Sequence, residues 1–164
     1  MARRWMSVTK LLVVLAMFGA TACGNDDPAG PGGGDGDLSA TIDGDDWTAD
    51  LAAVATRTNN VIGIGAGDSH GDRSIGIGFI DAGTGTYAIS ATNATNALLI
   101  EGQKSWAASA GVGGSGSLVI TTLTATRVAG TFSFNVVPNA NSGATGNRTI
   151  TNGEFDIEFS AAAQ

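Results

Sequence analysis

The stretch 131–136, TFSFNV, alternates apolar and polar side chains and sets the fold class of this chain. Alternation with a period of two predicts a strand with one buried face and one exposed face. The stretch 155–159, FDIEF, repeats the pattern with its three apolar residues on one face. Ile150 has the opposite parity to those three residues, so we expect a β-bulge around Asn152-Gly153.

Strand periodicity continues through the chain after residue 37, with many β-branched residues and no apolar pattern of period 3.6. Turn residues such as Asp43-Gly44, Asn59-Asn60 and Gly71-Asp72 separate the apolar stretches and favour consecutive hairpins. We therefore expect residues 38–164 to form one all-β domain, an antiparallel β-sandwich or partly closed barrel of about ten strands. The expected strands lie near 38–43, 47–57, 61–67, 73–80, 85–91, 97–101, 105–110, 117–126, 129–137 and 148–159.

Residues 1–22 have the organisation of a bacterial lipoprotein signal peptide. Arg3 and Arg4 precede an apolar run at 11–18, and the small residues 20–22 lead to Cys23. The apolar run is shorter than the roughly 20 residues that a membrane span needs. Cleavage would leave Cys23, the single cysteine of the chain, as the acylated first residue. We expect acyl chains such as palmitate on Cys23 to hold the protein on a membrane.

The residues around Cys23 also predict the compartment. The residue after the cysteine is Gly24 and not an aspartate, which is typical of lipoproteins exported to the outer membrane. We expect a protein of the cell envelope, anchored in the outer membrane on its periplasmic or its surface side. The pair Arg3-Arg4 leaves twin-arginine export open beside the general secretory route. Residues 23–37, CGNDDPAGPGGGDGD, would then be the lipidated cysteine and a flexible tether.

The chain is acidic, with a formal net charge of −7. Three of its eight basic residues lie within 1–22, so the processed chain would keep five basic residues against fifteen acidic ones. Phosphate backbones repel such a surface, and nucleic acid is therefore excluded as an expected partner.

Four stretches of the domain carry a resemblance to a known family: ATIDG at 40–44 followed by Trp47, GTY at 85–87, GTFSF at 130–134 and TITNGEF at 149–155. They resemble a family of uncharacterised secreted bacterial lipoproteins, which carry a tethered β-sandwich after a lipidated cysteine. The resemblance implies a sandwich fold and no known activity. It assigns no catalytic residue, because the recurring positions are turn glycines and core aromatics.

Two motifs match patterns of catalytic or phosphate-binding loops. The segment 67–71, GDSHG, fits the G-x-S-x-G pattern of a hydrolase, but the alternation at 74–79 predicts a strand after it instead of a helix. His70 is the single histidine and is adjacent to Ser69, where it is poorly placed to act as its base. The segment 111–116, GVGGSG, fits G-x-G-x-x-G, but a strand is again expected after it. We therefore expect no catalytic residues and interpret both segments as loops.

Acidic residues cluster at two expected turns and raise the possibility of calcium. Asp43, Asp45 and Asp46 share one turn, and Asp68 and Asp72 flank another. Calcium takes six to eight oxygen ligands, and no complete calcium loop is present, so both turns would have to meet in space. The alternative is that these aspartates cap solvated hairpins through local hydrogen bonds. We expect no cofactor, with calcium as the alternative, and zinc is disfavoured by the single histidine.

Isoleucine alternates with glycine in two neighbouring expected strands, IGIGAG at 62–67 and IGIGF at 75–79. Strand glycines often mark a place where another molecule or chain approaches closely. If the strands pair in register, Gly63, Gly65, Gly76 and Gly78 would form a smooth floor. Trp47 or Trp106 could then wall a shallow groove suited to a sugar or a peptide. The alternative is that a loop or side chain of the same domain covers the glycines.

Three classes of function follow. The first is a non-catalytic binding module of the cell envelope that takes a glycan, a peptide or another envelope protein. The second is a structural envelope lipoprotein without a discrete ligand, in which the acidic stripe Glu154, Asp156 and Glu158 serves solubility or ion bridging. The third is a glycan-acting enzyme that uses two carboxylates, which would lie in a cleft about 5 to 10 Å apart.

Overall fold

The computed structural model describes residues 36–160, in which all regular secondary structure is β-strand. The predicted signal peptide at 1–22, Cys23 and residues 24–35 of the predicted tether lie outside the described residues. The eleven strands are β1 (Asp37–Ile42), β2 (Asp45–Thr48), β3 (Val54–Thr58), β4 (Val61–Gly67), β5 (Arg73–Ile80), β6 (Gly85–Ala88), β7 (Asn96–Glu101), β8 (Lys104–Ala108), β9 (Ser115–Leu123), β10 (Arg127–Pro138) and β11 (Arg148–Glu158). Among residues 36–160 the structure contains no helix with the length and apolar character that a membrane crossing requires.

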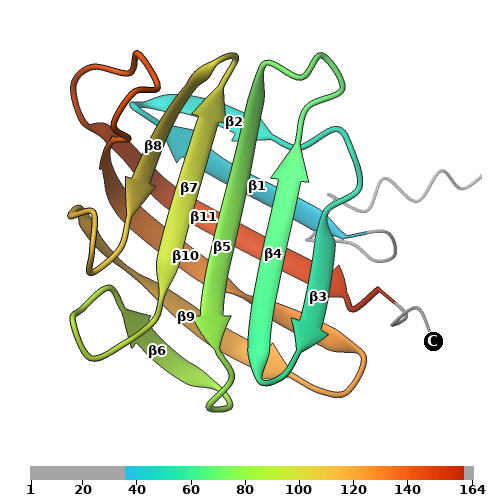
Figure 1. The fold of residues 1–164 in the computed structure, drawn as a ribbon. Helices are drawn as coiled ribbons and strands as arrows, with labels where there is room; N and C mark the ends of the chain where they lie inside the picture. The colour runs from blue at the N-terminus through green and yellow to red at the C-terminus, as the bar shows by residue number, and fades with distance from the viewer. Residues whose placement is uncertain (1–35, 161–164) are drawn as a thin grey trace, which may run out of the picture.

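The strands form one curled antiparallel sheet with two layers (Figure 1). The front layer holds β8, β7, β5, β4 and β3, and the back layer holds β2, β1, β11, β10, β9 and β6. The long strand β10 links them, because residues 128–135 pair with β9 while Val137 and Pro138 pair with β8. The sheet is therefore a half-barrel, and the expected all-β antiparallel fold is confirmed.

The expected single strand 47–57 is wrong, because this segment contains two strands in different layers. Strand β2 lies at one edge of the back layer and β3 at one edge of the front layer. Between them the backbone N–H of Ala53 donates to the carbonyl of Gly36 at 3.0 Å. The crossing lets Trp47 and Ala55 both point into the core from opposite layers. At the start of the domain, β1 begins at Asp37, one residue before the expected boundary.

The bulge expected around Asn152-Gly153 is confirmed in β11. Phe132 of β10 lies opposite Gly153, but Phe134 lies opposite Ile150, so two residues of β11 face Ser133 alone. Asn152 has a φ of 50°, a left-handed conformation that asparagine adopts more readily than most residues. The extra residue reverses the parity of β11, and Ile150 and the apolar residues after Gly153 therefore share the core face.

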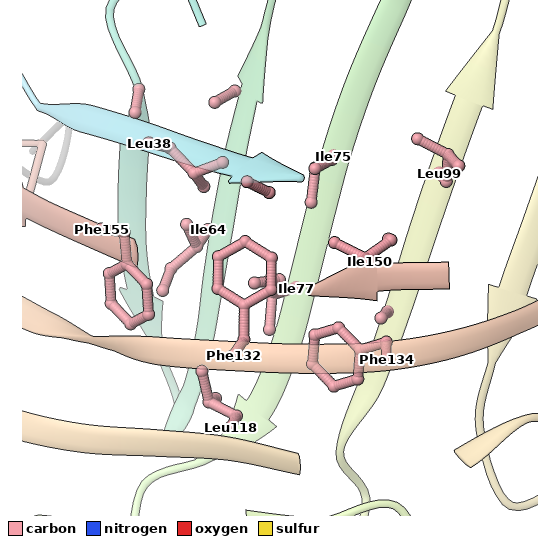
Figure 2. Packing of buried hydrophobic residues seen from close by; sticks show 14 of the residues in the cluster. Leu38, Ile64, Ile75, Ile77, Leu99, Leu118, Phe132, Phe134, Ile150 and Phe155 are labelled. Carbon is pink, nitrogen blue, oxygen red and sulfur yellow. The ribbon is translucent and has the colours of Figure 1, made fainter. Parts of the chain in front are cut away.

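The core lies between the two layers and is made of the inward side chains of both (Figure 2). Ile64, Ile75 and Ile77 approach from the front layer, while Phe132 and Phe155 approach from the back layer. Since the isoleucines of β4 and β5 point inward, the residues that alternate with them point out to solvent. This alternation places the glycines of both strands on the outer surface.

Candidate functional site

The four glycines identified in the sequence lie together on the outer surface of the front layer. Gly63 pairs with Gly78 and Gly65 pairs with Gly76 across β4 and β5. The expected pairing in register is therefore confirmed. Four adjacent positions without side chains form a flat strip at the centre of the layer, and we call the outer surface of β3, β4, β5, β7 and β8 the glycine face.

The strip is open at the pair formed by Gly65 and Gly76. A methyl group added at Gly65 would meet no atom within 4 Å, and one at Gly76 would meet its nearest neighbour, the Cβ of Leu98, at 3.8 Å. At Gly78 the amide of Asn96 lies 2.9 Å from the added carbon. At Gly63 the hydroxyl of Thr56 lies 3.3 Å from the added carbon. Side chains of the same domain thus cover the Gly63–Gly78 pair, and the Gly65–Gly76 pair is open.

The tryptophans proposed to wall this groove do not lie on the glycine face. Trp47 and Trp106 are 8% and 1% exposed and belong to the core. Trp106 pairs across strands with the buried Leu99, and its indole N–H donates to the carbonyl of Gly146 at 2.8 Å. Its parity matches the inward residues of β7, so the expectation that either ring borders the groove is wrong.

The borders of the strip come instead from the neighbouring strands. On one side β3 places Val54 opposite Gly65 and Thr56 opposite Gly63. On the other side β7 places Leu98 opposite Gly76. The face is therefore shallow and bordered by aliphatic and hydroxyl side chains, a composition that follows from the sequence once the strand order is known.

The glycine face carries no charge. The four charged residues of the five front strands, Arg57, Arg73, Glu101 and Lys104, share the parity of the buried residues and lie at strand ends. Every outward position in these strands is glycine, alanine, valine, leucine, isoleucine, serine, threonine or asparagine. The chain has a formal net charge of −7, yet the charged side chains of these strands lie away from the glycine face, which is neutral.

An ionic cluster that the sequence did not predict joins the two layers at one end of the half-barrel. Arg148 of β11 contacts Asp43 at 2.5 Å and Glu101 at 3.0 Å, and Arg73 contacts the other oxygen of Glu101 at 2.9 Å. The second oxygen of Asp43 accepts the backbone N–H of Thr149 at 2.8 Å. Two guanidinium groups therefore pair with two carboxylates, and these ion pairs connect the turn after β1 and strand β11 of the back layer to β5 and β7 of the front layer.

The contacts of Asp43 with Arg148 and Thr149 lower the pKa of its carboxyl group. Partial burial raises the pKa of this carboxyl, but hydrogen bonds from Thr149 and Arg148 outweigh burial and bring the pKa below its ordinary value of 3.8. Because the pKa is lower in the folded state than in the unfolded state, the ionised carboxylate stabilises the folded protein. This contribution to the free energy of unfolding is fully present at pH values above the pKa of the unfolded state. That stability is lost as the pH falls through the folded-state pKa.

We expect Asp43→Asn to destabilise the protein at pH 7 by less than about 1 kcal/mol, because the ion pair is partly exposed. Asparagine also tolerates the φ of 52° found at residue 43, so the substitution isolates the charge. Urea unfolding at pH 7 and pH 3 measures the effect, and the difference between wild type and variant should shrink at pH 3. An equal difference at both values would contradict the role of the carboxylate.

The remaining aspartates stay at their own turns. Asp46 accepts a hydrogen bond from the hydroxyl of Thr41 at 3.1 Å, and Asp68 accepts the backbone N–H of Asp72 at 2.8 Å. Asp45 lies in β2 near Asp46. Within residues 36–160 no group of three or more His, Cys, Asp or Glu side chains could hold a metal ion. The local hydrogen bonds are those expected of aspartates that cap hairpins.

A strand follows the GDSHG segment, as expected, and the strand expected after the GVGGSG segment begins two residues earlier than expected. Arg73–Ile80 follows the GDSHG segment, and β9 begins within the GVGGSG segment. Ser69 donates its hydroxyl to Asp50 at 2.7 Å and its backbone N–H to the same carboxylate. These hydrogen bonds from Ser69 lower the pKa of Asp50. An exposed carboxylate therefore holds this serine, in a geometry that stabilises a loop.

The fold and its neutral face define the class of protein to which the chain belongs, an all-β half-barrel domain with an open glycine strip. Residues 35–156 match the family described as a domain of unknown function (DUF6252), and the chain belongs to that family. No curated protein and no solved structure matches the chain.

Proposed function

We propose that this protein is a lipid-anchored, non-catalytic binding module of the bacterial cell envelope, whose glycine face docks onto a flat, uncharged surface of a partner protein. The observation that carries the proposal is the paired glycine strip, which is open above Gly65 and Gly76 and has no charged border. Interface cores are depleted of charge, and strand glycines permit close approach of another chain.

The composition of the glycine face favours a protein over a sugar. Ligand pockets for rings are commonly lined by aromatic side chains, and no outward position of the five front strands is aromatic. Val54, Val61 and Ile80 are each about half exposed on this face. A partner sheet could cover these three side chains and insert its own side chains over the glycines.

The sequence supports the anchoring part of the proposal. The signal at 1–22 and Cys23 predict acylation, and the tether that follows would place the folded domain about 20 Å from the bilayer. At that distance a partner in the same envelope layer is within reach of the glycine face. The acidic stripe supports a structural role less well, because Arg127 binds Asp156 through two contacts of 2.6 and 2.5 Å.

A photoreactive amino acid at Thr56 tests the proposal in living cells of the native host. We expect a discrete protein adduct from Thr56 on the glycine face, and none from the same group at Thr131, which is exposed on the back layer. Gly76→Glu should reduce the adduct at least tenfold, because the interface would bury an unpaired charge. Cys23→Ser should move the protein to the soluble fraction.

The controls separate the parts of the proposal. Thr131→Glu adds the same charge to the back layer and should leave the Thr56 adduct unchanged. Equal adducts from both positions, or an adduct insensitive to Gly76→Glu, would refute docking on the glycine face. If a glycan raises the melting temperature of the wild type but not that of Gly76→Glu, the ligand of the glycine face is a sugar and not a protein. Retention of Cys23→Ser in the membrane fraction would refute the anchor alone.

A further inference from the structure

Within residues 36–160 the half-barrel has three strand edges, and two of them are protected. Edge strand β2 carries Asp45 and Asp46, and charge on an edge discourages pairing with other chains. Edge strand β3 is covered at its centre, where Ala55 bridges to Phe159 in parallel and accepts the backbone N–H of Ser160 at 2.9 Å. The third edge strand, β6, has the sequence GTYA and no charge. It is therefore the edge most open to another strand.

The hydrogen-bonding groups of β6 that are free can be identified from its register with β9. Tyr87 pairs with Leu118, and the backbone N–H of Ile89 donates to Gly116 at 3.0 Å. In an antiparallel pair every second residue exchanges hydrogen bonds with its partner. The backbone groups of Thr86 and Ala88, which alternate with Tyr87, therefore point away from β9. Among residues 36–160, no other strand or loop forms a backbone hydrogen bond with Thr86 or Ala88.

A depression of about 420 Å³ lies against this edge. Its lining includes Thr84, Thr86 and Tyr87 from β6 and the residues just before it, and residues 92–94 from the loop after β6. No residue of β9 lines the depression, which places it on the free side of β6. None of its lining residues is charged, and Ile80 joins it to the glycine face.

We propose that β6 is a site of strand addition for an extended, uncharged peptide segment of a partner protein. The segment would pair with the free backbone groups of Thr86 and Ala88 and place one side chain in the depression. Two copies of this chain joined through β6 would each contribute only the four residues of that strand. The area that they bury would be well below the area that a stable dimer buries. The site is separate from the glycine face and does not depend on docking there.

Selection from a random heptapeptide library displayed on phage tests the site with the purified protein. We expect enrichment of uncharged, β-branched sequences, and synthetic copies of them should slow hydrogen exchange at the amides of Thr86 and Ala88. Ala88→Lys places a charge on an exposed edge position and should weaken peptide binding at least tenfold. Thr86→Pro removes the free N–H and leaves the pairing with β9 intact, so it should have a similar effect.

Matched variants make the outcomes distinct. Thr48→Lys places the same charge on the β2 edge, and Gly76→Glu alters the glycine face; both should leave peptide binding unchanged. The absence of enriched peptides, or enrichment that survives Ala88→Lys, would overturn the proposal. A dimer of the wild type that Ala88→Lys abolishes would also overturn it, since a second copy would then occupy the edge.

Discussion

Replacing Trp106 with alanine should lower the free energy of unfolding by about 3–5 kcal/mol, the range seen when a buried aromatic residue is removed from a core. Trp106 is 1% exposed and is among the largest fully buried side chains of the domain. Its ring also packs beneath Arg148, whose guanidinium carbon lies 4.9 Å from the ring centroid. Alanine would leave a cavity and remove the hydrogen bond that the indole N–H donates to the carbonyl of Gly146.

Urea unfolding followed by circular dichroism measures this loss, and Trp106→Phe is the matched control. Phenylalanine keeps an aromatic ring but cannot donate to Gly146, so we expect a loss nearer 1–2 kcal/mol. Neither variant should change partner docking at the glycine face in the fraction that remains folded. Reduced docking with unchanged stability would contradict the position of Trp106 in the core and return it to the groove.

The failure to place Trp106 shows what alternation along single strands can and cannot predict. Alternation indicated that Ile62 and Gly63 face opposite ways, and turn residues indicated that β4 and β5 form a hairpin. The glycine pairs follow from those two facts. Trp106 points to the same side of the layer as Leu99, with which it pairs on β7. Whether that side is the core or the glycine face depends on how β7 pairs with β5, and β5 with β4. That chain of pairings requires the strand order.

Contacts between residues far apart in the sequence also determine the elements that local patterns did not predict. The segment 47–57 contains enough strand-forming residues for one long strand, and nothing local marks the point where it leaves the back layer. The ionic cluster joins Asp43 to Arg148, which are 105 residues apart. The bulge in β11 was predictable because it rests on a local change of parity between Ile150 and Phe155. Local patterns were therefore sufficient for the bulge and for most strands. They could not predict the crossing between layers at 47–57 or the contacts between residues far apart in the sequence.

Gly153→Ala should destabilise the protein by about 1–3 kcal/mol, because it forces an additional carbon into a packed core. A methyl group at Gly153 would lie 2.5–2.6 Å from three ring carbons of Phe132, which is directly opposite on β10. The ring has little freedom to move, since Phe134 and Phe155 lie with their centroids 5.7 and 6.2 Å from it. Thermal and urea unfolding measure the loss.

Gly65→Ala is the matched control for Gly153→Ala, because both substitutions add one methyl group to a strand glycine. Position 65 offers open space, and replacing a strand glycine there should be neutral or should stabilise by up to about 1 kcal/mol through lower backbone entropy in the unfolded chain. Opposite signs would establish that Gly153 is required by the core while Gly65 is not required for folding. Equal losses would show that Gly65 is also needed for stability, and would remove the main reason to assign the open glycine strip to a partner.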